Sequence, residues 1–206
     1  MIKQYTTILI DMYGVILEQS KGCLLKYCKD NCTVERYAEI DKRILEERLF
    51  DKAGLGEIDS DEFMSLLGFD DLKFHTESYL KNYLTLDPAF VRFAEAVKDK
   101  YDLVLLSNDV SEWSRFIVEH HGIDKYFMHR TVSAEVGCRK PDLKIYDLTL
   151  EAIGRSPAEC LFIDNNVDNL IAAEEVGISP ILFNRDGLEF CGMTVGSFDE
   201  LLSLIG

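Results

Sequence analysis

The chain has 206 residues and a formal net charge of −15, from 22 Lys and Arg against 37 Asp and Glu. This acidity argues against binding to nucleic acid or to an anionic membrane surface, because both carry phosphate groups that would repel it. Hydrophobic residues make up 47% and charged residues 29%, as in an ordinary globular protein. No apolar run approaches the roughly 18 residues that cross a bilayer.

The apolar stretch at the N-terminus is short and ends at Asp11, so it is a poor signal peptide. None of the six cysteines forms a C-x-x-C pair, and without a signal they are expected to be reduced thiols. We therefore predict a cytoplasmic protein, monomer or homodimer, with no nucleic-acid and no membrane partner.

Short apolar runs recur along the chain and predict strands that are covered on both faces, at 6–10, 102–106, 160–163 and 180–183. Helical spacing of apolar residues lies between them, after Ser111 as a cap, after Pro141 at a helix start, and before Gly177 as a C-cap. Alternating strands and helices indicate an α/β fold with a mostly parallel sheet.

The first strand is separated from the second by about ninety residues, far more than one crossover helix needs. Residues 17–86 show only helical patterns, including one start at Asp59 and Glu62 that is typical of a capping box. We predict a helical insert at 17–86 and a core made of 1–16 and 87–206.

Polar side chains follow several of the predicted strands, where each strand ends. Since ligands of open parallel sheets bind beyond the carboxyl ends of the strands, these residues are expected to converge on one crevice. Taken singly, each is an ordinary turn, cap or surface residue. Taken together they predict a functional site made of Asp11, Ser107, Asn108, Lys140 and Asp164 with the neighbouring Asn165.

The order of these residues resembles the haloacid dehalogenase superfamily of hydrolases, over nearly the whole chain. The four motifs are matched by Asp11-Met12-Tyr13-Gly14-Val15, by Ser107, by Lys140 before a proline, and by the loop from Asp164 to Asn169. The resemblance implies a Rossmann-like, doubly wound parallel sheet with an inserted all-helical cap domain.

The resemblance also implies roles. Asp11 is expected to be the nucleophile, Ser107 and Asn108 to contact the transferred group, and Lys140 to neutralise charge. Gly14 allows a tight bend beside the substrate. A Mg²⁺ ion is expected on the Asp11 carboxylate, the Tyr13 carbonyl, Asp164 and Asn165.

Two departures from the phosphatase pattern leave alternatives open. Tyr13 stands where a second aspartate usually acts as acid and base, and Asn165 weakens the metal site. Both departures favour the metal-independent 2-haloacid dehalogenases. Tyr146 also matches the pattern of these enzymes. Lys42 or Arg43 lies near the position at which they carry a halide-binding arginine. Against this, Asp164 would repel a substrate carboxylate.

A Mg²⁺-dependent phosphatase that acts on a small, anionic phosphorylated metabolite through an aspartyl-enzyme intermediate is therefore favoured. The alternatives are a dehalogenase-like hydrolase and a degenerate member that binds a ligand without turning it over.

Overall fold

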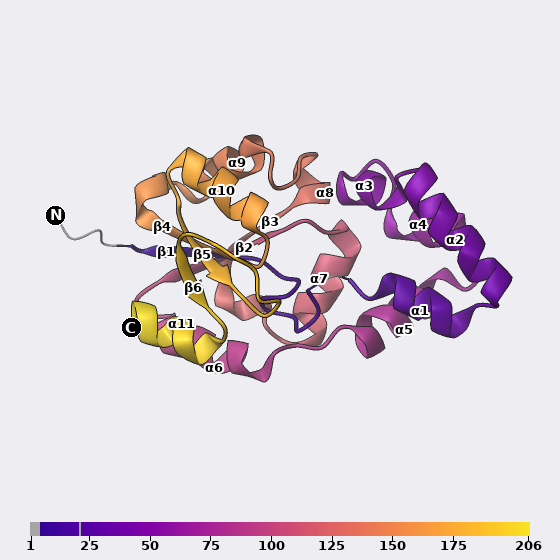
Figure 1. Ribbon diagram of the computed structural model, residues 1–206, viewed down its shortest axis with the longest axis horizontal. Helices are drawn as coiled ribbons and strands as arrows, with labels where there is room; N and C mark the ends of the chain where they lie inside the picture. Colours follow the sequence, from indigo (N-terminus) through magenta and orange to yellow (C-terminus); the bar gives the residue numbers. More distant parts are fainter. Residues whose placement is uncertain (1–4, 21) are drawn as a thin grey trace.

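The computed structural model describes residues 5–20 and 22–206. Its centre is a six-stranded sheet in the order β3-β2-β1-β4-β5-β6, in which all neighbouring strands pair in parallel. Figure 1 shows the sheet in the left half of the molecule. The strands are β1 (Thr7–Ile10), β2 (Asp102–Ser107), β3 (Phe127–Val132), β4 (Cys160–Asp164), β5 (Ser179–Phe183) and β6 (Met193–Val195).

Helices cover both faces of the sheet. Because successive side chains of a strand point to opposite faces, Ile8 and Ile10 join one apolar cluster and Leu9 joins another. The first cluster includes α6 (Pro88–Val97), α7 (Ser111–His120) and α11 (Phe198–Ile205); the second includes α9 (Leu143–Ile153) and α10 (Val167–Val176). This arrangement confirms the doubly wound α/β fold.

The four predicted strands are present, with bounds shifted by at most one residue at either end. The sequence analysis missed β3 and β6, which are the two edge strands. Both have exposed or half-buried positions, so neither shows the uniformly apolar run of a strand that is covered on both faces.

Two predicted helix starts are wrong. Ser111 does not cap α7, because it is the first residue of that helix and Val110 is the N-cap, without a capping side-chain hydrogen bond. Pro141 precedes α9 rather than opening it, because the helix begins at Leu143 and Asp142 is its N-cap, with a side chain that accepts a hydrogen bond from the Lys144 amide. The predicted C-cap at Gly177 is confirmed, since this residue ends α10 with a φ of 99°.

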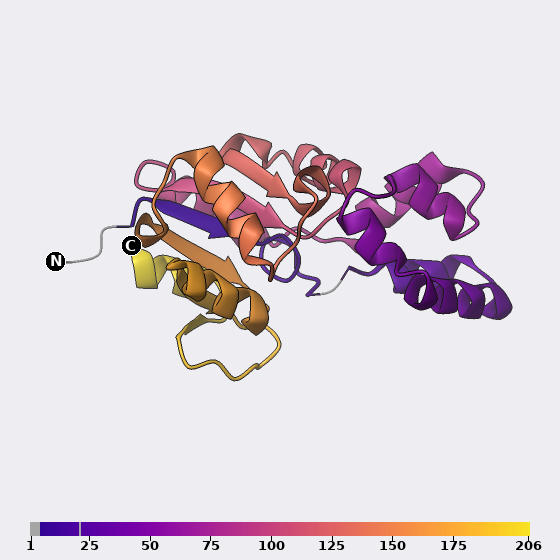
Figure 2. The same cartoon turned by 90° about the horizontal axis from the view of Figure 1, so that it is seen from above.

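Between β1 and α6 the described residues form five helices, which are called here the cap helices. Side chains of Thr33, Asp59 and Asp71 cap three of them, in agreement with the predicted start at Asp59. Figure 2 shows them beyond the carboxyl ends of the strands. They are α1 (Leu24–Asn31), α2 (Val34–Glu46), α3 (Leu49–Gly54), α4 (Ser60–Leu66) and α5 (Leu72–Tyr83).

The chain enters and leaves the cap helices along two adjacent segments. The Glu18 amide donates to the Thr85 carbonyl at 2.9 Å, and the Asp87 amide donates to the Ile16 carbonyl at 2.9 Å. Residues 12–20 hold no helix, so the predicted insert at 17–86 is helical only from Leu24 onward in the part described. Residues 1–4 of the predicted core and residue 21 of the insert lie outside the described residues.

Few polar contacts join the cap helices to the sheet-bearing core. Trp113 Nε1 donates to Ser60 Oγ at 2.7 Å, Ser133 Oγ donates to the Gly54 carbonyl, and Arg139 pairs with Asp51. The short helix α8 (Ser133–Val136) supplies one of these contacts. A cavity lies in this region, and several of its polar residues come from the ends of the strands.

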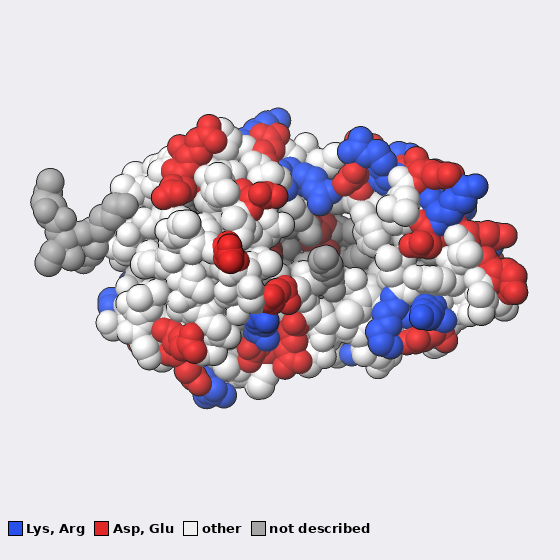
Figure 3. All heavy atoms as spheres, viewed as in Figure 1, with Lys and Arg blue, Asp and Glu red and all other residues white. Residues whose placement is uncertain are grey.

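Acidic and basic side chains are interspersed on the face seen in Figure 3, over the core and over the cap helices. Among the described residues, no helix is long and apolar enough to span a membrane.

Candidate active site

Lys140 holds two carboxylates together at the carboxyl end of the sheet. Its ammonium nitrogen donates to Asp11 Oδ1 at 2.7 Å, to Asp164 Oδ2 at 2.7 Å and to the Leu106 carbonyl at 2.8 Å. The Lys140 side chain is 1% exposed and that of Asp164 is fully buried. These bonds use all three ammonium donors, so the lysine is fixed between the ends of β1, β2 and β4.

The backbone of Lys140 is fixed as well. Asn108, just after β2, donates from Nδ2 to the Lys140 carbonyl at 2.9 Å and accepts from the Lys140 amide at 2.8 Å. This pair of bonds lets a lysine in a loop reach the two carboxylates in one conformation.

The loop after β4 orients Asp164. Its Oδ1 accepts from the Asn166 amide at 2.8 Å, and its Oδ2 accepts from Asn169 Nδ2 at 3.0 Å as well as from Lys140. Asn166 also caps α10 by accepting from the amides of Asp168 and Asn169. The predicted acidic loop is thus a tight turn that aims one carboxylate at Lys140.

Burial governs the electrostatics of the cluster. Burial raises the pKa of Asp11 to about 7, while Lys140 acts in the opposite direction and the charge of Asp164 adds to the rise. Burial alone would lower the pKa of Lys140, but its two carboxylate partners raise that pKa above its ordinary value. Lys140 therefore stays charged.

Tyr13 and Asp109 form a second buried pair. The Tyr13 hydroxyl donates to Asp109 Oδ1 at 3.1 Å, and the Val110 amide donates to the same oxygen at 2.8 Å. Asp109 Oδ2 is buried and has no partner among the described residues. Burial raises the pKa of Asp109 to about 8, and burial with the nearby Asp109 raises that of Tyr13 well above its usual range.

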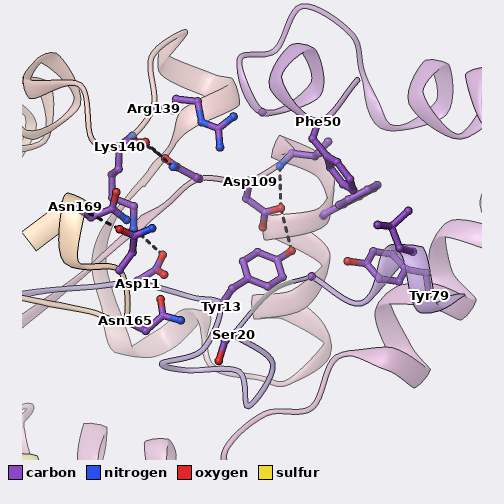
Figure 4. Close-up of a pocket in the computed structure, with 17 residues that line it drawn as sticks. Asp11, Tyr13, Ser20, Phe50, Tyr79, Asp109, Arg139, Lys140, Asn165 and Asn169 are labelled. Atoms are coloured by element: carbon purple, nitrogen blue, oxygen red, sulfur yellow. Dashed lines mark hydrogen bonds and ion pairs between the residues drawn. The ribbon is translucent and has the colours of Figure 1, made fainter. Parts of the chain in front are cut away.

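A cavity of about 490 Å³ joins these groups to the cap helices. Figure 4 shows Asp11, Lys140, Asn165 and Asn169 at one end, and Phe50 and Tyr79 at the other, with Tyr13 and Asp109 between. The residues of the first group, together with Asn108, are called here the polar end. Phe50 and Tyr79 belong to a larger apolar surface, called here the apolar wall, which comprises Leu25, Phe50, Tyr79, Val110 and Trp113.

Comparison with known proteins identifies the family. A protein-family model described as a haloacid dehalogenase-like hydrolase matches residues 5–177. The chain belongs to this family. The predicted membership of the haloacid dehalogenase-like hydrolases is thereby confirmed.

Two curated relatives illustrate the range of the family. A glyceraldehyde 3-phosphate phosphatase from Methanothermobacter thermautotrophicus is 29% identical over 114 residues, which cover 50% of this chain and 50% of that protein. A (S)-2-haloacid dehalogenase from a Pseudomonas species is 29% identical over 125 residues, which cover 58% of this chain and 53% of that protein. The chain thus spans about half the length of these relatives.

A solved structure shares the fold of this haloacid dehalogenase-like chain. A family enzyme from Bacteroides thetaiotaomicron, in complex with magnesium and inorganic phosphate, superposes with a TM-score of 0.75 at 21% identity. The match covers 91% of this chain and 98% of that one.

The structure brings most of the predicted site residues together. Asp11, Tyr13, Asn108, Lys140 and Asn165 line the cavity. Asp164 lies directly behind Lys140 and Asp11.

Gly14 and Ser107 lie beside the cavity rather than lining it. Gly14 has a φ of 79°, and an added Cβ would stand 2.2 Å from Asn165 Nδ2. Ser107 is fully buried at the end of β2, and its hydroxyl has no hydrogen-bond partner among the described residues.

Three predicted substrate contacts are not brought to the cavity. Lys42 and Arg43 lie on α2, where they pair with Glu46 and Glu47 one turn along the same helix. The helical period of α2 does not say which of its faces is turned toward the core. Lys42 and Arg43 do not lie on that face. Tyr146 is buried beneath the site, where its hydroxyl donates to the Asn169 carbonyl at 2.8 Å.

The sequence analysis missed other residues of the cavity, namely Asp109, Trp113, Arg139 and the cap residues Phe50 and Tyr79. Asp109 and Arg139 adjoin predicted residues in the chain, so proximity to a motif was a usable signal. Trp113 belongs to the core, at 3% exposed, and also lines the cavity. For Phe50 and Tyr79 the sequence held no comparable signal.

The donor set fits a hard divalent cation. Asp11 and Asp164 share one ammonium group, so with both carboxylates ionised, as metal ligands are, the three side chains carry a net charge of −1. The Tyr13 carbonyl and the Asn165 amide would add neutral oxygen ligands, which Mg²⁺ accepts together with water and substrate phosphate. Two carboxylates suffice for such a site.

Proposed function

We propose that the protein is a Mg²⁺-dependent phosphatase that acts on a small phosphorylated metabolite through a phosphorylated Asp11. The observation that carries this proposal is the buried Asp11–Lys140–Asp164 cluster at the end of a cavity. When bound, Mg²⁺ would offset the repulsion between these carboxylates and the phosphoryl oxygens. Asp11, Asp164, the Tyr13 carbonyl and Asn165 would hold it.

In the first step the Asp11 carboxylate attacks phosphorus, and the bond from phosphorus to the ester oxygen breaks. The leaving oxygen takes a proton from water and departs as the alcohol. In the second step a water attacks the same phosphorus and the bond from phosphorus to the Asp11 oxygen breaks. The proton of this water neutralises the hydroxide left by the first step, and inorganic phosphate leaves the free Asp11 carboxylate. Each step keeps the phosphoryl charge near Lys140.

We assign two residues to the transferred group. Lys140 neutralises negative charge that would otherwise accumulate beside Asp11. The Ser107 hydroxyl, which has no partner among the described residues, is the donor that we assign to a phosphoryl oxygen. Asn108 acts through Lys140, because it fixes the lysine backbone at both its amide and its carbonyl.

The dehalogenase alternative has one structural argument in its favour. Tyr13 occupies the position of the usual second aspartate, and its raised pKa keeps it protonated, so it cannot serve as a base near neutral pH. Against it, Asp164 is fully buried beside Asp11 and would repel a substrate carboxylate.

Turnover with Mg²⁺ tests the proposal. We expect wild-type protein to hydrolyse 4-nitrophenyl phosphate when Mg²⁺ is supplied and to stop when the metal is chelated. The Asp11→Asn variant should lose at least about 10³-fold in kcat, because the nucleophile is gone. Circular dichroism of the variant controls for folding.

Other outcomes would replace the proposal. Metal-independent release of halide from a 2-haloacid would establish the dehalogenase alternative. Absence of turnover on a wide range of phosphate esters and on 2-haloacids would favour a ligand-binding protein without catalysis.

A further inference from the structure

The apolar wall faces the polar end across the cavity. Leu25, Phe50 and Tyr79 come from cap helices, whereas Val110 and Trp113 belong to the start of α7. The rings form a connected cluster in which the ring centroids of Tyr79 and Trp113 are 5.3 Å apart and those of Phe63 and Trp113 are 5.5 Å apart. The part of the substrate that leaves with the alcohol would meet this wall.

The polar side-chain atoms of the wall offer little to a ligand. Trp113 Nε1 donates to Ser60 Oγ at 2.7 Å, and Tyr79 is 1% exposed. The carbonyl of Gly54, which also lines the cavity, accepts from Ser133 Oγ. These groups therefore present mainly carbon surface to a ligand.

The cationic side chains of the cavity are already paired with carboxylates of the protein. Its two cations are Arg139 and Lys140 among the described residues, and Arg139 is paired with Asp51 while Lys140 is paired with Asp11 and Asp164. No cation from the described cap helices lines the cavity to hold a second anionic group. Among the buried side-chain atoms of the described lining residues, one polar atom has no partner, Asp109 Oδ2, at the junction of the two ends. The remaining polar side chains of the lining, such as Asn165, belong to the polar end or to its rim rather than to the wall.

From this arrangement we infer that the preferred substrate is a phosphate monoester of an apolar alcohol, alkyl or aryl, rather than of a sugar or another polyol. A polyol would give up hydrogen bonds to water and find almost no partners at the wall, which is costly for each buried hydroxyl. An apolar group gains by leaving water for the same surface. The inference rests on the proposed function for the reaction but not for binding.

Binding can be measured without turnover, because Trp113 is the single tryptophan of the chain and lies in the wall. Its fluorescence should report titrations with methyl-, butyl-, hexyl- and octylphosphonate in the presence of Mg²⁺. Each further methylene that is buried should tighten binding by about fourfold. The length of the alkyl chain at which this gain in affinity ends measures how far the apolar wall extends. Comparing the affinity for phenylphosphonate with that for hexylphosphonate shows whether aryl groups are preferred.

A matched pair of variants locates the effect. Phe50→Ala removes a ring of the wall, whereas Phe74→Ala removes an exposed ring of α5 that does not line the cavity. We expect Phe50→Ala to weaken binding of hexylphosphonate by about tenfold and to flatten the dependence on chain length. Phe74→Ala should leave both unchanged.

Turnover supplies the second readout. With Mg²⁺, kcat/KM for hexyl phosphate should exceed that for glucose 6-phosphate and for glycerol 1-phosphate by at least tenfold. Chain-length-dependent binding without any turnover would sustain the apolar site and overturn the phosphatase. Equal affinity for methyl- and hexylphosphonate, or a preference for the polyol phosphates, would overturn the inference whether or not the protein is a phosphatase.

Discussion

The polar end of the cavity is built mainly by loops that follow strands, together with Lys140 from the loop after α8, whereas the apolar wall is built largely by side chains of helices. At the polar end, Lys140 ties the ends of three strands together through bonds of 2.7–2.8 Å. At the wall, aromatic rings pack without directional bonds to the sheet. The comparison teaches that a buried ionic network holds the reacting groups in place. The residues of the apolar wall, which would select the substrate, can be substituted without disturbing that network.

Removing the lysine is the most severe way to break the polar end. Lys140→Met leaves two buried carboxylates without their cation, and we expect it to lower the free energy of unfolding by about 3–5 kcal/mol. Urea denaturation in the presence of a chelator measures this. Lys144→Met, at an exposed position of α9, is the matched control. A loss below about 1 kcal/mol would show that the network is not what holds this end together.

Gly14 tests how closely the loops of the polar end approach one another. Gly14→Ala places a Cβ 2.2 Å from Asn165 Nδ2 and 2.8 Å from the Ser20 Cα, at a φ of 79°. We expect a loss of roughly 1–3 kcal/mol in unfolding free energy. Gly122→Ala has a φ of 63° and no heavy atom within 4 Å, so it isolates the backbone cost. Equal losses in the two variants would argue that the approach is not tight.

Asp109 lies between the two ends and makes stability depend on pH. Its folded pKa is about 8, whereas an aspartate in an unfolded chain titrates near 3.9. Between these values the folded protein holds a proton that the unfolded chain has released. The stabilisation is therefore complete below about pH 4 and is lost as the pH rises through 8.

The Asp109→Asn variant should remove this dependence, since the amide does not titrate. We expect the fall in unfolding free energy from pH 5 to pH 8 to be smaller in the variant by at least about 1 kcal/mol. Urea denaturation at several pH values, in a chelator, measures it. Asp99→Asn, at an exposed position, should behave as wild type.

The smallest effect is expected where the cap helices meet the core. Arg139 and Asp51 form an ion pair whose side chains are 39% and 34% exposed, so their coupling should be only about 0–1 kcal/mol. A double-mutant cycle with Arg139→Ala and Asp51→Ala measures the coupling. A coupling well above that range would mean that this pair fastens the cap helices to the polar end.

The sequence by itself determined the polar end. Asp11, Lys140 and the Asp164 loop are far apart in the chain, but parallel strands bring their carboxyl ends to one edge of the sheet, so strand-end residues can be read as neighbours. Continuous apolar runs predicted the four central strands. They did not reveal β3 and β6, because these strands at the edges of the sheet lack such a run.

Only the tertiary structure decided what faces the polar end. Helical periodicity shows that one face of α2 is buried, but it does not say which element buries it, so Lys42 and Arg43 were placed in the site although they pair with Glu46 and Glu47 outside it. Phe50 and Tyr79 reach the cavity through the packing of α3 and α5 around Trp113. That packing is a long-range choice among apolar surfaces, which local pattern does not encode.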